Sequence, residues 1–266
     1  MIREYNRSRI PPPDGPTASM QHELPFTADL EVERNCLTCP YLPEQEAKLV
    51  YWLPHAGTRA TDLDRRLEAG QRRHGPLVYE PQCDSCRECI SLRIPVAGFR
   101  PSRSQRRVWQ RGQSQVVARL GLPVNDVTRL ELINKHSEWR GWLGSSERIS
   151  EEFYEQVFVC SLFHSVEIAY YVDQKLVGVA ICDRGEIGFS AVYTYYDPEY
   201  AGLSLGTYSV LYQLAYCRQI GLQYLYLGYY VADCPSLMYK ANFGPHQRRI
   251  QGQWVDYETK HKGTPS

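Results

Sequence analysis

The chain has 266 residues, of which 43% are apolar, so it can bury a sizeable core and is long enough for two domains or one large domain. Its formal net charge is zero, which indicates no particular class of partner. No run approaches the roughly 18 apolar residues of a membrane span, and the N-terminus lacks an apolar signal core, so we expect a cytoplasmic protein.

The first part of the chain predicts a tail, a helix and a strand. Residues 1–22 contain three consecutive prolines and few large apolar groups, which is typical of a flexible tail. Thr61 and Asp64 have the spacing of a capping box, and Gly70 can end the helix that follows them. The run PLVYEP (76–81) then predicts a strand.

Five cysteines have the spacing of metal ligands: Cys36-x2-Cys39 and, after a long gap, Cys83-x2-Cys86-x2-Cys89. A C-x2-C pair lets two thiolates bind one ion, and two such pairs complete a tetrahedral zinc site or hold an iron–sulfur cluster. The alternative is that these thiols are buried small side chains or redox-active groups without a metal. Nine cysteines, an odd number, indicate free thiols rather than a secreted disulfide framework.

An arginine-rich segment follows the cysteines. The sequence from 102 to 121 predicts a helix with Ser102 or Ser104 as its N-cap, on which Arg103, Arg107 and Arg111 share one side. Guanidinium groups bind phosphate through two parallel hydrogen bonds, so we expect a nucleic-acid partner, unless carboxylates of the acidic segment 126–200 neutralise the arginines. Residues 89–125 contain seven arginines and no Asp or Glu: Arg93, Arg100, Arg103, Arg106, Arg107, Arg111 and Arg119.

The remaining elements predict the α/β (α+β) class. A helix begins near Thr128, whose capping partner is Glu131, and another follows Ser150. Three β-rich runs separated by short polar turns indicate an antiparallel meander. An apolar helix (204–220), a strand (224–230) and a short helix come next. We expect a smaller N-terminal domain with the cysteines at 23–125, a C-terminal domain at 126–250 and a C-terminal tail at 251–266.

Several stretches resemble the aminoacyl-tRNA–protein transferase family. One branch of that family transfers arginine, and the other contains the bacterial aspartate/glutamate leucyltransferases, which the YLP, RIPV and PSRSQRR stretches resemble more. This chain departs from the pattern at Cys36, which adds a cysteine before CPYLP, and at Leu203, where a basic residue often stands. The matching stretches are CPYLP (39–43), GQRRHGPLVYEPQCDSCRECISLRIPV (70–96), FRPSRSQRR (99–107), FSAVYTYYDPEYAGLSLGTYSVL (189–211) and GLQYLYLGYYVADCPSLMYKANFGPH (221–246).

The resemblance implies a C-terminal half similar to the GNAT acyltransferase fold and transfer of an amino acid, with leucine favoured, from charged tRNA to the α-amine of proteins that begin with Asp or Glu. Such transfer marks proteins for degradation through their N-termini. The tRNA ester is already activated, so no cofactor is required. The acidic first residue of the acceptor needs a cation, for which we select Lys240 first and Arg72 or Arg73 next. The tRNA needs a cationic track, for which we select Arg103, Arg106, Arg107 and Arg111.

Candidates for the chemical step must stabilise the oxyanion that forms as the amine attacks. Gly206 and Thr207, near the start of the apolar helix, could present free backbone amides. Alternation places Tyr193 and Tyr195 on one face of their strand, and the family stretches single out Tyr193 and Tyr229. β-Propensity alone would also select these tyrosines as half-buried sheet residues.

Three alternatives stay open. Arginyl transfer is the alternative within the family. An acyl-CoA-dependent N-acetyltransferase would use the same fold, but LSLGTY (203–208) has one glycine where its pyrophosphate loop uses two. A non-catalytic, metal-stabilised RNA-binding protein would explain the cysteines and the arginines, but it leaves the C-terminal stretches without a role.

Overall fold

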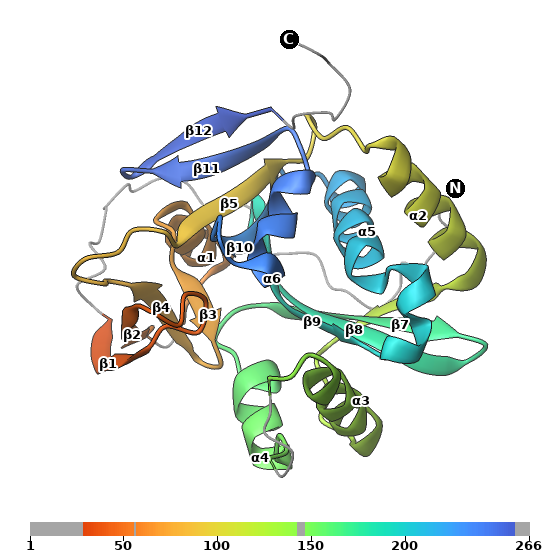
Figure 1. Ribbon diagram of the computed structural model, residues 1–266, viewed down its shortest axis with the longest axis horizontal. Helices are drawn as coiled ribbons and strands as arrows, with labels where there is room; N and C mark the ends of the chain where they lie inside the picture. Colours follow the sequence, from red (N-terminus) through yellow and green to blue (C-terminus); the bar gives the residue numbers. More distant parts are fainter. Residues whose placement is uncertain (1–28, 56, 143–146, 259–266) are drawn as a thin grey trace.

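The computed structural model describes residues 29–55, 57–142 and 147–258, which form two β-sheets with helices packed around them (Figure 1). A four-stranded sheet has the order β1-β2-β4-β3, and an eight-stranded sheet has the order β12-β11-β5-β10-β9-β8-β7-β6. Neighbouring strands run antiparallel except for β9 and β10, which are parallel. This mixed architecture with antiparallel sheets confirms the predicted α/β class.

The four-stranded sheet and its helix come from the first part of the chain. α1 (Ala60–Glu68) joins β2 to β3 and buries Leu63 and Leu67 in one cluster with Val78 of this sheet and Tyr226 of the larger one. The small sheet therefore shares part of its apolar core with the eight-stranded sheet. Its strands are β1 (Leu30–Thr38), β2 (Glu46–Leu53), β3 (Arg72–His74) and β4 (Leu77–Pro81).

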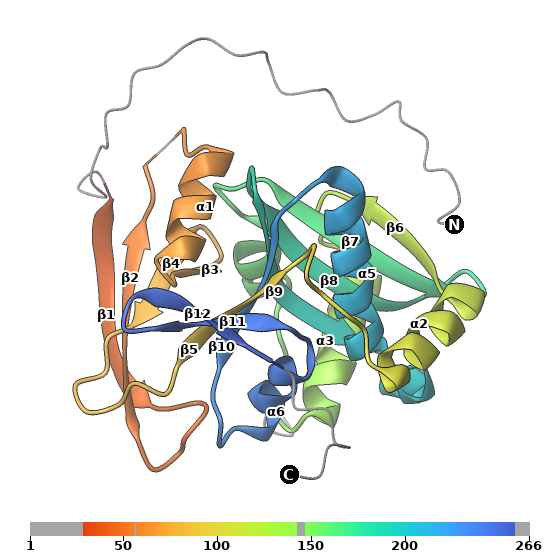
Figure 2. The ribbon, with the colours of Figure 1, turned by 90° about the horizontal axis from the view of Figure 1, so that it is seen from above.

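Helices cover both faces of the eight-stranded sheet. α5 (Leu205–Ile220) and α2 (Arg103–Gln115) lie side by side on one face (Figure 2), whereas α3 (Val127–Trp139) and α4 (Glu151–Tyr154) lie on the other (Figure 1). The strands are β5 (Ile90–Pro95), β6 (Val117–Gly121), β7 (Ser165–Val172), β8 (Lys175–Arg184), β9 (Gly188–Tyr196), β10 (Tyr224–Tyr230), β11 (His246–Ile250) and β12 (Gln253–Tyr257). Shorter elements are a π-helical turn at Glu155–Val159, 3-10 helices at Pro198–Leu203 and Tyr239–Asn242, and α6 (Pro235–Met238).

Strand alternation explains how both faces become apolar. On β8, Ala180 and Cys182 pack in the core beneath α5, whereas Val179 and Ile181 pack in the core beneath α3. A strand that is apolar at successive positions is expected where both faces are covered. The predicted meander is therefore confirmed as β7-β8-β9, and α5 ends at Gly221 as predicted, with that glycine at a φ of +78°.

Two predicted helix starts are each wrong by two residues. α1 begins after Arg59, and its capping carboxylate is Asp62 rather than Asp64. Asp64 instead accepts hydrogen bonds from the backbone N–H groups of residues 186, 187 and 188, at 2.7, 3.0 and 2.9 Å. α3 begins after Asp126, whose side chain accepts from the backbone N–H of Arg129. Asp accepts more strongly than the Thr predicted for this role, so it displaces the start of α3 by two residues.

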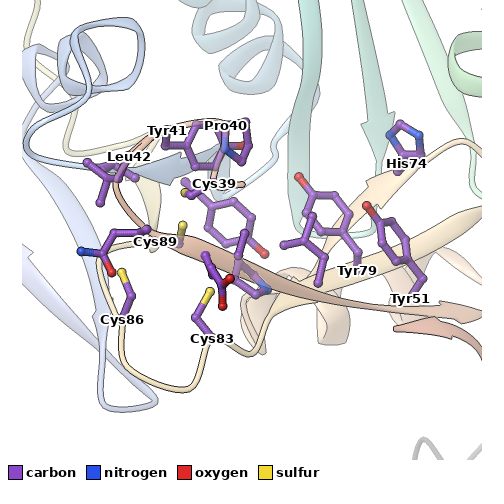
Figure 3. A pocket seen from close by; sticks show the side chains of 17 residues that line it. Cys39, Pro40, Tyr41, Leu42, Tyr51, His74, Tyr79, Cys83, Cys86 and Cys89 are labelled. Atoms are coloured by element: carbon purple, nitrogen blue, oxygen red, sulfur yellow. The ribbon is translucent and has the colours of Figure 1, made fainter. Parts of the chain in front are cut away.

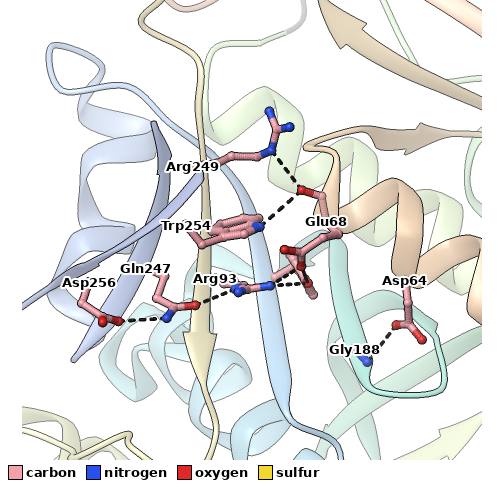
Figure 4. Close-up of polar contacts among 9 residues, drawn as sticks. Asp64, Glu68, Arg93, Gly188, Gln247, Arg249, Trp254 and Asp256 are labelled. Carbon is pink, nitrogen blue, oxygen red and sulfur yellow. Dashed lines mark hydrogen bonds and ion pairs between the residues drawn. The ribbon is translucent and has the colours of Figure 1, made fainter. Parts of the chain in front are cut away.

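A polar network attaches α1 to the eight-stranded sheet (Figure 4). Arg93 of β5 is buried, forms an ion pair with Glu68 of α1 and donates from Nε to Gln247 at 2.7 Å. The Glu68 carbonyl accepts from Arg249 at 2.9 Å and from Trp254 at 3.3 Å. Glu68, which lies 25 residues earlier in the chain, neutralises Arg93. The prediction that Arg93 lacks a carboxylate partner is therefore wrong.

The eight-stranded sheet takes strands from both predicted domains. β5 and β6 precede residue 126, and β5 lies between β11 and β10. The division at 125/126 stays a prediction, and it passes through this sheet. β12 falls within the predicted C-terminal tail, whereas the predicted tail at 1–22 lies outside the described residues. Among the helices that the structure describes, none is long and apolar enough to cross a membrane.

Candidate functional site

Two parallel strands separate at the centre of the large sheet, and an arginine from the small sheet fills the opening. β9 and β10 pair only from Gly188–Ser190 to Tyr224–Tyr226. Beyond that point Arg72 of β3 donates from Nη2 to the carbonyl of Ala191 at 2.7 Å. Gly228, at a φ of +84°, makes room for it, because a Cβ there would lie 3.3 Å from Arg72 Nε. Arg72 is thus held between the two strands.

Lys240 lies beside Arg72 and is also buried. Its Nζ donates to the backbone carbonyl of Tyr229 at 2.7 Å. Burial and the neighbouring Arg72 cation together lower the pKa of Lys240 to about 7. The site therefore combines a fixed cation with an amine that gains or loses its proton near neutral pH. Both residues were predicted as cations for an acidic substrate.

The two predicted tyrosines lie in different clusters. Tyr229 is buried, donates to the carbonyl of Gly70 at 3.1 Å and has its ring 6.1 Å from that of Tyr79. Tyr193 packs in the core beneath α3 against Phe158, at 5.1 Å between ring centroids, and burial raises its pKa to about 12. The structure brings Tyr229 close to Lys240 but does not bring Tyr193 to the same place.

Arg73 points away from this opening and is used inside the fold. Its Nε donates to Asp183 of β8 at 2.7 Å, and the side chains of this ion pair are 1% and 0% exposed. Nη1 also donates to the carbonyls of Gly75 and Val157. These contacts account for Arg73 without a substrate, so we rank it below Arg72 as an acceptor-binding residue.

An aromatic cavity of about 110 Å³ lies next to the buried cations. Tyr79 and Tyr229 line it. Burial raises the pKa of both phenols, and the nearby charge of Arg72 offsets part of that rise, which shows that both rings lie close to Arg72. Figure 3 shows four cysteines, Cys39, Cys83, Cys86 and Cys89, gathered at one end of the cavity, with Tyr51, Tyr79 and His74 at the other.

The predicted five-cysteine metal site does not form in this structure. Cys36 lies on the extended strand β1 and is exposed, so Cys36 and Cys39 do not make the tight turn that a C-x2-C pair needs. Within residues 29–55, 57–142 and 147–258, no three His, Cys, Asp or Glu side chains are arranged to hold a metal ion. We therefore assign no chemical step to zinc or to an iron–sulfur cluster.

The four predicted tRNA-binding arginines lie exposed on α2. Ser102 caps the helix as predicted, accepting from the backbone N–H of Gln105, whose side chain accepts in turn from the Ser102 N–H at 2.8 Å. In the described part of the chain, none of the four forms an ion pair with a carboxylate. Within the described residues, internal neutralisation, the alternative raised by the sequence, is thus absent for Arg103, Arg106, Arg107 and Arg111.

A groove of about 710 Å³ runs between the start of α2, the start of α5 and β11. Thr207, in the first turn of α5, lines it, and Gly206 is half-buried one residue earlier. Tyr239 and Arg248 also line the groove, and neither was predicted as a site residue. The basic run HQRRI (246–250) was the signal in the sequence, but its role depends on β11 pairing with β5, a strand about 150 residues earlier.

Comparison with known proteins gives a consistent result. The family model described as "Arginine-tRNA-protein transferase, N terminus" matches residues 37–107, and the model described as "Arginine-tRNA-protein transferase, C terminus" matches residues 128–250. An aspartate/glutamate leucyltransferase from Chromobacterium violaceum is 36% identical and covers 81% of this chain and 89% of the relative. The proteins of that name from Aeromonas hydrophila and Methylobacillus flagellatus are 36% and 33% identical, covering 84% and 92% of this chain and 92% and 96% of their own lengths.

Similarity to solved structures is low. The crystal structure of FemX has 10% sequence identity and a TM-score of 0.42, covering 68% of this chain and 63% of that chain. The C-terminal domain of a putative lysylphosphatidylglycerol synthetase from Agrobacterium fabrum has 11% identity and a TM-score of 0.43, covering 64% and 51%.

Proposed function

Because the chain belongs to the family of arginine-tRNA–protein transferases, we propose that it transfers leucine from leucyl-tRNA to the α-amine of proteins that begin with aspartate or glutamate. The observation that carries this proposal is the identity of 33–36% to relatives named aspartate/glutamate leucyltransferase, over most of both chains. Leucine placed on such N-termini would direct proteins to degradation. We place the reaction in the cytoplasm, where charged tRNA is available.

The reaction converts an ester into an amide and needs no cofactor. The neutral α-amine of the acceptor attacks the ester carbonyl, the C–O bond to the tRNA ribose breaks, and the ribose oxygen takes up a proton. An α-amine has an ordinary pKa of about 8, so an appreciable fraction is neutral at pH 7 and only a mild base is required. The enzyme has to align the two substrates and stabilise the oxyanion. We propose Gly206 and Thr207 for the oxyanion, and Tyr229 or Tyr193 for holding the ester.

We propose that Arg72 and Lys240 recognise the acidic side chain of the acceptor, and that Arg73 supports them from inside the fold, where its ion pair with Asp183 holds β3 against β8. The proximity of two cations in a buried position supports this assignment, because a carboxylate would relieve their repulsion. Binding of a carboxylate would also raise the pKa of Lys240 and fix its charged form. A neutral first residue would leave both cations uncompensated and would be rejected.

We propose that the exposed arginines of α2 bind the phosphates of the tRNA arm. Among the residues that the structure describes, no carboxylate pairs with them, which supports this role because their charges remain available to phosphates. For the fold, we propose that the β7-β8-β9 meander, α5 and the parallel strand β10 form a GNAT-like transferase unit within residues 126–250. The order of these elements supports that description.

The experiment that tests this function offers the protein leucyl-tRNA and arginyl-tRNA side by side, each with a labelled amino acid, together with a peptide that begins with Asp. We expect label to reach the peptide from leucyl-tRNA. Transfer from arginyl-tRNA instead would assign the arginyl activity of the same family. Transfer of neither amino acid would contradict the proposed function and favour the non-catalytic RNA-binding alternative.

A further inference from the structure

Arg248, on β11, is held rigidly in the wall of the 710 Å³ groove. Its guanidinium lies over the ring of Tyr230 at 4.0 Å and over the ring of Tyr257 at 4.4 Å. Its Nε donates to Nε2 of the buried His246 at 3.1 Å. The His246 ring in turn stacks on Tyr257, with an interplanar angle of 6°. Two aromatic faces and an imidazole therefore fix the plane of this guanidinium.

The two terminal nitrogens of the Arg248 guanidinium, Nη1 and Nη2, are available to a ligand. Across the described ranges, only Nε of this side chain has a hydrogen-bond partner, and no carboxylate lies within ion-pair distance of it. Burial and the neighbouring Arg248 cation lower the pKa of His246 to about 4, so this imidazole is neutral at pH 7 and accepts the hydrogen bond. An arginine whose orientation is fixed in advance loses little entropy when it binds a phosphate through both terminal nitrogens.

The other groove residues suit a nucleic acid. Arg100, Ser102 and Ser104 line the side that belongs to α2, and Thr207 lines the side that belongs to α5. Tyr239 is 41% exposed and presents an aromatic surface on which a base can stack. One carboxylate, Glu258, also lines the groove, so the two arginines leave it with a net positive charge. The groove therefore connects the exposed arginines of α2 with the start of α5.

We propose that this groove binds the unpaired 3′ end of the donor tRNA, with Arg248 gripping one of its phosphates and Tyr239 stacking on one of its bases. The inference rests on the proposed function and extends it by naming where the single-stranded end lies. A duplex arm on the face of α2 would then lead its 3′ end along the groove toward Gly206 and Thr207, where we place the ester.

The test compares two RNAs and four proteins. The RNAs are an uncharged tRNA with its unpaired 3′ nucleotides and the same tRNA from which these nucleotides have been removed. The proteins are wild type, Arg248→Gln, Arg248→Lys and the matched control Arg249→Gln. Arg249 lies next to Arg248 on β11, but it donates to the Glu68 carbonyl and does not line the groove. Thermal unfolding of each variant checks that the fold is intact.

We expect wild type to bind the complete tRNA about 100-fold more tightly than the trimmed one, with about tenfold from the charge-assisted phosphate contact of Arg248 and about tenfold from the base stacked on Tyr239. Arg248→Gln should bind the complete tRNA about tenfold more weakly than wild type does, and should bind the trimmed tRNA as wild type does. The affinity of Arg248→Lys for the complete tRNA should lie between those of wild type and Arg248→Gln, because lysine keeps the charge but cannot bind a phosphate through two parallel hydrogen bonds. Arg249→Gln should behave like wild type.

Three results would overturn the proposal. In the first, Arg248→Gln binds the complete tRNA with the affinity of wild type. In the second, the substitution lowers the affinity for both RNAs by the same factor. In the third, it changes only the KM of the acceptor peptide, which it raises. If wild type still transfers leucine when one of these results is found, the location of the 3′ end is wrong but the function stands. If wild type neither binds tRNA nor transfers leucine, both fail.

Discussion

Two cations buried side by side determine what the opening between β9 and β10 can bind. Burial and the charge of Arg72 together make the proton of Lys240 easy to lose. A buried charge without a partner is costly, so this pair is a poor choice for stability and a good one for recognising an acid. These two residues therefore lower the stability of the protein when no acidic substrate is bound.

The lowered pKa of Lys240 makes stability depend on pH with a definite sign. Between the folded pKa of about 7 and the ordinary value of 10.5, the folded chain binds fewer protons than the unfolded chain, so folding becomes more favourable as pH rises. The free energy of unfolding of wild type, relative to Lys240→Met, should increase by about 2 kcal/mol from pH 7 to pH 9. Urea denaturation at several pH values measures it.

Lys135→Met is the matched control for this experiment. Lys135 is a partly exposed lysine whose pKa is raised by its hydrogen bonds to Asp197 and Glu199. It keeps its proton throughout this pH range in both states, so its difference from wild type should stay constant. If the difference between wild type and Lys240→Met also stays constant, Lys240 does not titrate near neutral pH in the folded protein.

At the scale of elements, α2 is positioned by its contact with α5. Gly112 of α2 faces the ring of Tyr208 so closely that a Cβ there would lie 2.2 Å from two ring carbons. Tyr208 is 1% exposed and also stacks on Trp109, so the ring cannot move without disturbing both helices. This contact sets the face that α2 buries, and so leaves its arginines toward solvent.

Gly112→Ala should therefore destabilise the protein by about 2 kcal/mol, although alanine favours helix over glycine. The control is Gly121→Ala on β6, where no atom lies within 4 Å of the added Cβ, and which should change stability by less than about 0.5 kcal/mol. Thermal unfolding compares the two. A Gly112→Ala protein at least as stable as wild type would show that α2 does not pack on α5 in this way.

Elements were predictable from the sequence to the extent that their signals are local. The apolar helix, its terminal Gly221 and the β7-β8-β9 meander rest on composition and turn residues close by, and the structure confirms them. Arg72, Arg73 and Arg93 looked alike in sequence. Arg73 is paired with a carboxylate 110 residues away, and Arg93 with one 25 residues away. Only these tertiary contacts distinguish the two structural arginines from Arg72. Arg248 was missed for the same reason.

At the scale of the whole molecule, the two sheets share a core and a buried ion pair. Arg73 of β3 and Asp183 of β8 join the small sheet to the large one, and Ser165 donates to Asp183 at 2.6 Å. The Glu68–Arg93 network makes a second connection (Figure 4). Since strands from both predicted domains belong to one sheet, with β5 inserted between β11 and β10, we expect the described chain to unfold in one cooperative transition.

Arg73→Met should destabilise the protein by about 3–5 kcal/mol, because it leaves Asp183 buried without its partner. Arg65→Met, which breaks the exposed Arg65–Asp62 pair on α1, should cost less than about 1 kcal/mol. Urea denaturation followed by tryptophan fluorescence and by circular dichroism measures both. Two separate transitions in wild type would contradict the single cooperative unit.

The most direct test of the account measures kcat/KM for leucine transfer to two peptides that differ only in their first residue, Asp or its neutral isostere Asn. If Arg72 and Lys240 recognise the acid, the Asp peptide should be preferred by about 100-fold, equivalent to about 3 kcal/mol, and Lys240→Met should lose most of that preference. Equal transfer to both peptides by wild type, or an unchanged preference in Lys240→Met, would contradict the account.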